Sequence, residues 1–535
     1  MKINSYLKTG IPLFCLYLIV RLFSQYEYFP LAEDQCAYLS LARNLPEYIL
    51  YNNDFYLIHP PLYPAAIAAM ACIMPLFHAG LAVSILFGIL NYFLLLRMAR
   101  VFSLGRIGTL IALLYFVLNA TSISMETHVS RMNMLLFLTG MAICSFQEYL
   151  QTREKRHLVM TCIFNVLSVS CSDQGILLLG AQGVQFIVHG EFARDWKVFL
   201  KIMLLSLLFF SIWPIVRLCF YLSNPDYPAG IDGTVEYFTR ITLMDVLQPN
   251  NLPITKYHRS FFTSTTFSIA NISFQNIVIL FAGIVFLPKW ICISMVSIFS
   301  IGAMAMGIVR KDKHILALLA ISLVFLVPSM AGMYYWYSYP AVIPFALLIG
   351  RGVHLLAERF RIREKWLVIA EVSIAVILSL MWLSGFREAK SNTVFSASGG
   401  THFLFSRIPV TKGQAVFRNL PEENAGFMAP IGLVSDAIYL SGRRFLALPY
   451  DCDKLDYLLA KYDVKYICFP GECLNGFSDG NMNFVTSRDI IGRIVSTPSK
   501  FEKAAEWKES YPDCYPAETF YLYRVNAGPD TGLKQ

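Results

Sequence analysis

Long apolar runs constrain this 535-residue chain more than any other feature of its sequence. Several of them approach the roughly 20 residues that a helix needs to cross the hydrocarbon core of a bilayer. Hydrophobic residues make up 56% of the chain, and its mean hydropathy is +0.52. Charged residues make up 15%, against roughly 25% in ordinary globular proteins. These properties exclude a soluble globular protein and predict a mainly α-helical membrane protein that crosses the bilayer many times.

Clusters of Lys and Arg decide how the apolar runs are threaded. Two runs, 61–77 and 275–287, are ambiguous. Counting both as crossings would put several basic clusters on the outer side, against the positive-inside rule. We therefore expect both to lie as helices at the outer surface, with the N-terminus inside and the C-terminus outside. The remaining runs give about eleven predicted spans: 11–29, 80–98, 107–124, 131–150, 157–172, 174–189, 199–221, 290–309, 314–333, 339–357 and 366–386.

The large loops all fall on the outer side under this topology. They include the first outer loop, 30–79, and the final segment, 388–535. Strand-like runs alternate with a helix-like run at 455–463 in the final segment, which indicates a small α/β domain. We therefore predict a membrane domain over 1–387 and a soluble domain over 388–535. An exported domain of this kind suits a bacterial inner-membrane protein whose C-terminus lies in the periplasm; a domain in the lumen of an organelle is the alternative.

Cysteines and metal-type motifs give weaker signals. In an oxidising compartment the four cysteines of the soluble domain could form disulfides, with three possible pairings: Cys452, Cys468, Cys473 and Cys514. We find no Gly-rich phosphate loop, zinc-type spacing or nucleic-acid motif, and we expect no metal, cofactor or nucleic-acid partner.

The first outer loop concentrates polar and ionisable side chains between two apolar runs. It carries Glu33, Asp34, Tyr38, Arg43 and His59. Ionisable groups next to membrane spans cost free energy, so such a cluster is a functional-site hypothesis by default. A solvated loop would explain the same charges, and the order of the residues favours the functional site.

That order resembles the first outer loop of a superfamily of membrane glycosyltransferases with the GT-C fold, which use polyprenyl-phosphate sugars. The superfamily includes the protein O-mannosyltransferases and the lipid A aminoarabinose transferases. Its loop reads Asp-Glu-x-x-Tyr, then a short Ala-Arg helix, then a Pro-Pro-Leu-Tyr-Pro type motif. Here Asp34 stands four residues before Tyr38, Ala42 and Arg43 follow, and HPPLYP spans 59–64.

The resemblance implies an inverting glycosyltransferase acting at the outer face of the membrane. Its partners would be the bilayer, a polyprenyl-phosphate sugar as donor, and a hydroxyl acceptor on a lipid, glycan or protein. A carboxylate must then take the acceptor proton, and we assign that role to Asp34, with Glu33 beside it. Asp34 could alternatively be the N-cap of a helix over 35–45. Departure of the phosphate needs donors or positive charge, for which His59 is the candidate. Tyr38 and Arg43 are expected on one face of the helix, lining the donor site.

Other outer turns could complete the site. Glu126 and His128 precede the fourth span, and Asp173 lies between two spans. The sequence WYSYP supplies Trp336 and Tyr337, which could equally belong to an interfacial aromatic belt.

Three positions depart from the pattern of the superfamily. Gln35 stands in place of the second acid of the loop, Gln174 follows Asp173 where many relatives carry a basic residue, and Trp336 replaces an Arg. A non-catalytic member of the superfamily is therefore one alternative. A transporter or flippase of a lipid-linked sugar is another, although we find no internal repeat and no mid-span acid of the kind such proteins use.

Overall fold

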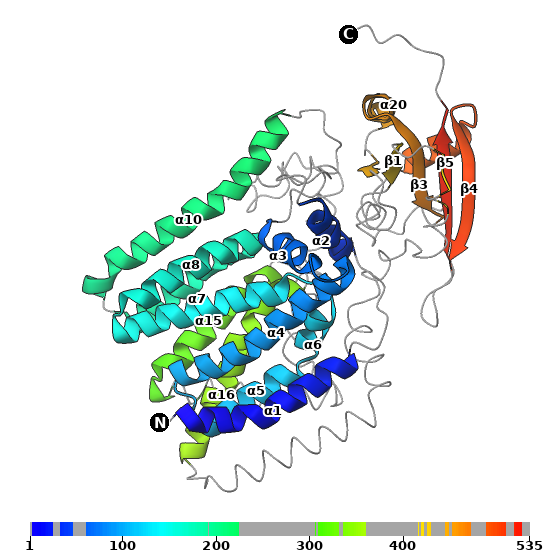
Figure 1. The fold of residues 1–535 in the computed structure, drawn as a ribbon. Coiled ribbons are helices and arrows are strands. Elements are labelled where there is room, and N and C mark those ends of the chain that lie inside the picture. The colour runs from blue at the N-terminus through cyan, green and yellow to red at the C-terminus, as the bar shows by residue number, and fades with distance from the viewer. Residues whose placement is uncertain are drawn as a thin grey trace. The chain divides into compact units, whose positions relative to one another are not determined.

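The computed structural model describes residues 3–24, 33–45, 60–190, 192–223, 309–330, 335–359, 425–429, 445–448, 452–471, 488–509 and 518–526, with a few single residues between them. The described residues belong to two compact units. One holds the long apolar helices (Figure 1). The other holds helix α2 (Glu33–Asn44) and a β-sheet.

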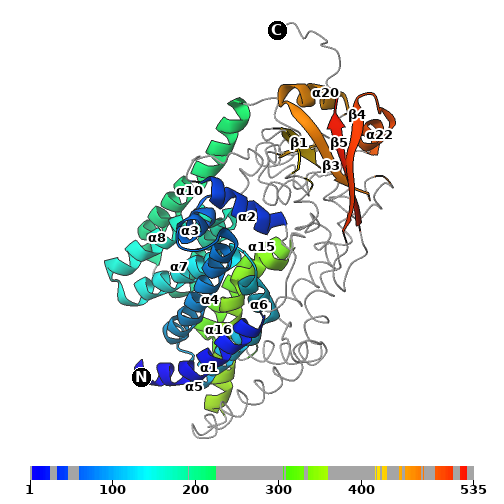
Figure 2. The same ribbon diagram turned by 45° about the vertical axis from the view of Figure 1, so that its right-hand side comes forward.

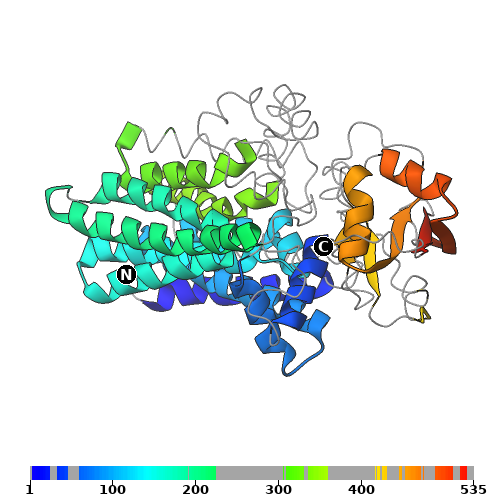
Figure 3. The same ribbon diagram turned by 90° about the horizontal axis from the view of Figure 1, so that it is seen from above.

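The helical unit is a bundle whose members lie roughly alongside one another (Figures 1 and 3). Its helices are α1 (Ile3–Ser24), α3 (Leu62–Ala71), α4 (Leu76–Val101), α5 (Gly105–Leu118), α6 (Ala120–Thr127), α7 (Met132–Thr152), α8 (Lys155–Cys171), η2 (Asp173–Ile176), α9 (Leu177–His189), α10 (Phe192–Ser223), α15 (Lys313–Met330), η4 (Tyr335–Ala341) and α16 (Val342–Arg359).

The predicted spans that fall on described residues are helical. Three helical stretches among these residues are long and apolar enough to cross a membrane: Leu76–Val101, Arg194–Trp213 and Ser338–Arg359. The apolar parts of α1, α5 and α15 are shorter. The predicted spans 290–309 and 366–386, and the run 275–287, lie almost wholly outside the described residues, so the number of eleven stays a prediction.

Two elements refine the expected threading. Helix α3 has 10 residues; it rises about 15 Å, half of the roughly 30 Å hydrocarbon core, which agrees with the expectation that 61–77 does not cross. The predicted span 107–124, by contrast, is not one helix. It is broken at Asn119, whose side chain accepts a hydrogen bond from the Ser122 N–H at 2.9 Å and so caps α6.

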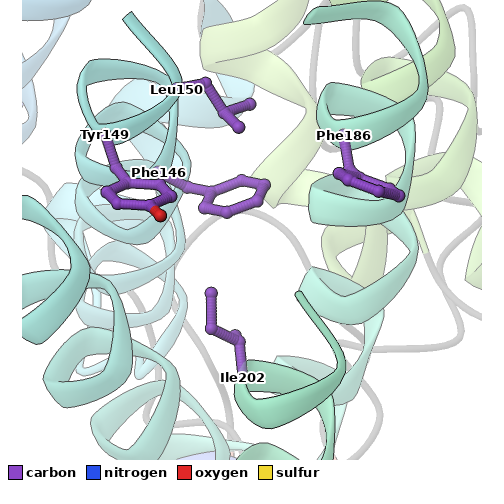
Figure 4. Close-up of a cluster of buried hydrophobic side chains, with 5 residues drawn as sticks. All are labelled: Phe146, Tyr149, Leu150, Phe186 and Ile202. Carbon is purple, nitrogen blue, oxygen red and sulfur yellow. The ribbon is translucent and has the colours of Figure 1, made fainter. Parts of the chain in front are cut away.

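Helix α7 forms the centre of the bundle and is buried along almost its whole length. It packs against α4, α8 and α9. Polar side chains in this interior bond across helices, as membrane interiors require: the Gln185 amide donates to the Ile143 carbonyl at 2.9 Å, and Asn165 exchanges bonds with Gln182 at 2.9 and 2.7 Å. An apolar cluster closes one end of this interior (Figure 4): Phe146, Tyr149, Leu150, Phe186 and Ile202.

Helices α5 and α16 approach each other through two glycines. A Cβ built on Gly108 would lie 2.5 Å from the carbonyl oxygen of Gly350, and a Cβ on Gly350 would meet the carbonyl oxygen of Gly108. Small residues of this kind let helix backbones come close inside membranes. The pair therefore sets the separation of α5 and α16.

One end of the bundle, which we call the basic end, gathers the Lys and Arg clusters 97–106, 153–156, 194–201 and 310–313. Three ion pairs join the helix ends there: Arg97 with Glu148 at 2.6 Å, Arg153 with Asp195 at 2.6 Å, and Arg351 with Asp312 at 2.7 Å. Burial raises the pKa of Asp312, but hydrogen bonds from Arg351 and the Ile315 N–H outweigh it and lower that pKa below its ordinary value. Among the described residues these clusters share one end, as the threading predicts.

The second unit contains a five-stranded mixed sheet of order β2-β1-β3-β5-β4. Its strands are β1 (Gly426–Ala429), β2 (Phe445–Ala447), β3 (Val464–Pro470), β4 (Phe501–Glu509) and β5 (Glu518–Val525), with helices α20 (Cys452–Lys461) and α22 (Arg488–Ser496) beside them (Figure 2). Strands β1, β2 and β3 are parallel to one another, and β5 runs antiparallel to both of its neighbours, β3 and β4. The predicted helix near 455–463 is α20; the bounds predicted for a separate soluble domain stay a prediction.

Cys468 corrects one expectation for this unit. It lies in β3, is buried, and is a free thiol. Burial raises its pKa to about 12. It therefore takes no part in the disulfides considered for the four cysteines; Cys473 and Cys514 lie outside the described residues.

Candidate functional site

Helix α2 carries the acidic pair predicted for catalysis at its very start. It begins at Glu33, so Asp34 is its second residue. The alternative of Asp34 as the N-cap of a helix over 35–45 is therefore not what the structure has. Negative charge in the first turn of a helix is favoured by the helix dipole, which helps to explain why a helix begins here.

The two donor-site candidates on α2 do not share a face. Every residue from Gln35 to Ala42 is buried, including Tyr38, whereas Arg43 is exposed. Five residues along an α-helix turn the side chain by about 140°, which is why the expectation of one common face was wrong. His59 lies outside the described residues, so its role stays a prediction.

The Pro-Pro-Leu-Tyr-Pro motif is anchored in the bundle by its tyrosine. Tyr63 is fully buried at the start of α3, and its hydroxyl is hydrogen-bonded to the Ser84 hydroxyl of α4 at 3.0 Å. The Ser130 N–H donates to the same Ser84 oxygen at 3.1 Å. The motif is thus joined to both α4 and the turn before α7.

Glu126 of α6 forms a buried ion pair with Arg21 of α1. Arg21 Nε donates to Oε2 at 2.7 Å and Nη2 donates to Oε1 at 3.2 Å, while Nη1 reaches the Val117 carbonyl at 2.7 Å. The Tyr17 hydroxyl also donates to Oε2, at 2.5 Å. Gly88 of α4 makes room for this group, because a Cβ there would lie 2.5 Å from the Glu126 carboxyl carbon.

This pairing decides what Glu126 can do in the state described. A buried charge costs free energy unless it is paired and hydrogen-bonded, and here both carboxylate oxygens receive N–H groups from one guanidinium. A general base needs an oxygen within reach of a substrate proton. The contacts of Glu126 are therefore those of a structural ion pair, and its role as a site-lining residue stays a prediction.

The remaining candidates lie in turns of the bundle. His128 is half-buried between α6 and α7, and Asp173 and Gln174 are half-buried in η2. Trp336 and Tyr337 belong to η4, and their side chains are outside the described residues. Their neighbour Tyr339 is buried, and its hydroxyl donates to Asn133 Oδ1 of α7 at 3.1 Å, which fixes η4 on the bundle.

Sequence patterns did not mark four residues that organise this region of the bundle: Tyr17, Arg21, Tyr63 and Ser84. Arg21 had a readable signal, because an arginine inside the predicted span 11–29 is costly without a partner. Its partner lies 105 residues away, which no local pattern reveals. Among the described residues no group of three or more His, Cys, Asp or Glu side chains lies together as a metal site would need.

Comparison with known proteins shows which fold this architecture resembles. No protein-family model matches the sequence, and no curated protein matches it either. Solved structures do match: ArnT from Cupriavidus metallidurans bound to undecaprenyl phosphate has a TM-score of 0.52 at 11% identity, over 95% of this chain and 97% of that one.

Two further solved structures share the fold. The archaeal oligosaccharyltransferase AglB from Archaeoglobus fulgidus, in complex with an inhibitory peptide and a dolichol-phosphate, has a TM-score of 0.51 at 12% identity, over 99% of this chain and 75% of that one. The arabinofuranosyltransferase AftD from Mycobacteria has a TM-score of 0.53 at 14% identity, over 98% of this chain and 42% of that one. The GT-C fold that the loop motif predicts is thus confirmed.

Proposed function

We propose that this protein is an inverting glycosyltransferase that moves a sugar from a polyprenyl phosphate to a hydroxyl acceptor. One observation carries the proposal: a chain that shares the GT-C fold over 95% of its length carries Glu33 and Asp34 at the start of the first-loop helix. Structures of similar fold have been obtained with undecaprenyl phosphate and with a dolichol-phosphate, which supports a lipid phosphate as part of the donor.

The reaction needs one base and a stabilised leaving group. Asp34 takes the proton of the acceptor hydroxyl, whose oxygen forms a bond to the anomeric carbon. The bond from that carbon to the phosphate oxygen breaks on the opposite face, so the configuration inverts and the polyprenyl phosphate leaves. His59 and Arg43 would stabilise the charge that develops on this phosphate. No metal or cofactor enters the scheme.

The proposed place of reaction is the membrane face opposite the basic end. The positive-inside rule puts the basic end in the cytoplasm. The first outer loop and the soluble domain would then face the periplasm of a bacterial inner membrane. This placement suits a donor whose lipid tail stays in the bilayer while its sugar faces outward.

A transfer assay tests the proposal. Purified protein in lipid nanodiscs receives undecaprenyl-phosphate sugars together with lipid, glycan and peptide acceptors that carry hydroxyl groups. We expect release of undecaprenyl phosphate that depends on the acceptor, and its loss in Asp34→Asn. Binding of donor without transfer to any acceptor would favour the non-catalytic alternative. Movement of intact donor between leaflets of proteoliposomes, with no cleavage, would favour a flippase.

A further inference from the structure

The part of the first outer loop that joins α1 to α3, residues 25–61, is held at both of its ends by the same short stretch of the bundle, residues 126–130. The chain enters the loop from α1, which ends at Ser24. Arg21 stands in the last turn of that helix, and its guanidinium holds both carboxylate oxygens of Glu126. Nη1 also binds the Val117 carbonyl at the end of α5, next to the helix break. The entry of the loop is thereby fixed on α6.

The exit of the loop is fixed four residues further along the same stretch. The chain returns to the bundle at α3, where Tyr63 is fully buried. Its hydroxyl bonds to Ser84 Oγ at 3.0 Å, and that oxygen accepts the Ser130 N–H at 3.1 Å. Tyr63 is thus connected to Ser130 through one shared oxygen.

The stretch is itself held from several sides, so it can serve as a fixed point. Asn133, just beyond it, donates from Nδ2 to the Met125 carbonyl at 2.8 Å. The Asn91 amide of α4 donates to the Asn133 carbonyl at 3.0 Å, and Tyr339 of η4 donates to Asn133 Oδ1. Four helical segments thus converge on the α6–α7 connection.

We propose that Glu126–Ser130 is a positioning element that holds both ends of the loop bearing Glu33, Asp34 and His59. This inference rests on the proposed glycosyl transfer. Catalytic groups must be held within a fraction of an ångström of their working geometry, and a misplacement of about 1 Å can cost about 100-fold in rate. Fixing both ends of a loop removes much of its conformational freedom. Glu126 and Tyr63 therefore act through Asp34 and not on substrate.

We call the two attachments of the loop, the Arg21–Glu126 ion pair and the Tyr63–Ser84 hydrogen bond, its ties. Two variants each remove one tie. Tyr63→Phe removes a single hydroxyl from the exit. The double variant Arg21→Gln with Glu126→Gln removes the entry pair without leaving a lone buried charge. Two matched controls break similar bonds elsewhere: Tyr92→Phe removes a buried hydroxyl that donates to the Gly10 carbonyl at 2.6 Å, and Glu148→Gln breaks the Arg97 ion pair at the basic end.

Each full-length variant is measured in nanodiscs for kcat, donor dissociation constant, thermal stability and amide hydrogen exchange over residues 25–59. We expect the two tie variants to lose about 10- to 100-fold in kcat and to exchange faster over 25–59, with donor binding changed less than about threefold. The control variants should keep kcat within about twofold of the wild-type value, even if their thermal stability falls as much as that of the tie variants.

The outcomes separate this inference from the proposed function. Tie variants that match the controls in both kcat and exchange overturn the positioning role, whatever the transfer assay shows. If wild-type protein transfers no sugar, or Asp34→Asn keeps full turnover, the proposed function fails. In that case the positioning role is overturned as well if amide exchange over 25–59 is the same in the tie variants as in wild type. A tie variant that loses turnover and gains exchange while Asp34→Asn is inactive supports both.

Discussion

Arg21 and Glu126 form a two-point ion pair inside the bundle, with side chains that are 4% and 1% exposed. The two residues lie 105 positions apart in the sequence, on α1 and α6. Because both charges are out of water, removing one of them leaves the other buried without a counter-charge, which costs free energy of folding.

Glu126→Gln should destabilise the protein by about 3–5 kcal/mol, since it leaves the Arg21 charge buried without its counter-charge. Removing both charges together should cost less. Thermal unfolding in detergent micelles measures the difference. Glu148→Gln is the control, because Arg97 there is 38% exposed and such pairs contribute about 0–1 kcal/mol. Equal losses in Glu126→Gln and Glu148→Gln would contradict the assignment.

Asp34→Asn should lower the transfer rate by about 100- to 10,000-fold, because the amide keeps the size of the side chain but cannot take the acceptor proton. Donor binding should change little. Initial rates with a matched donor and acceptor, compared with a donor-binding isotherm, provide the measurement. Glu33→Gln is the matched comparison and should lose less. A larger loss of transfer rate in Glu33→Gln than in Asp34→Asn would show that Glu33, and not Asp34, is the base.

Gly108→Ala should destabilise the bundle, because the new methyl group would lie 2.5 Å from the Gly350 carbonyl oxygen and α5 must move away from α16. Overpacking of this kind typically costs about 1–3 kcal/mol. Gly183→Ala in α9 is the control: its Cβ would lie 3.6 Å from the Phe199 ring, an ordinary contact, and alanine favours the helix by about 1 kcal/mol. A melting temperature that falls equally in both variants would count against the glycine contact.

Cys468 should resist alkylation in the folded protein. Burial raises its pKa to about 12, so almost none of it is thiolate at neutral or mildly alkaline pH, and the thiolate is the reactive form. Peptide mass spectrometry after iodoacetamide treatment at pH 8 should find Cys468 unmodified until denaturant is added. Cys72, an exposed free cysteine, serves as the internal control. Rapid modification of Cys468 without denaturant would show that β3 opens readily.

Sequence patterns predicted the parts of this fold that depend on local composition. Apolar runs gave the helices, and the basic clusters gave the predicted threading, because charge at helix ends is a local property. The 10-residue length of α3 agrees with the prediction that 61–77 does not cross. The break at Asn119 was readable in principle, since Asn is a preferred N-cap, but the apolar residues around it hid the signal. Strand β4 was missed because its exposed positions carry charges, as edge strands commonly do.

The candidate site could be predicted only in part. The order of residues from Asp34 to the proline motif pointed to the GT-C fold, but it did not show that Tyr63 anchors that motif through Ser84. Contacts such as Arg21 with Glu126 join distant segments, and single-sequence patterns carry no information on them. The faces of Tyr38 and Arg43, in contrast, follow from helix geometry and could have been separated by counting residues.

Gly88 gives the ion pair an evolutionary consequence. A methyl group at this position would lie 2.5 Å from the Glu126 carboxyl carbon and 2.7 Å from the Tyr17 hydroxyl, so the three residues share one volume. None of them can enlarge alone. In an alignment of descendants of a common ancestor, position 88 should therefore remain glycine wherever 126 is acidic, and a bulkier residue at 88 should accompany a smaller, neutral one at 126. Substitutions at the three positions are therefore expected to occur together.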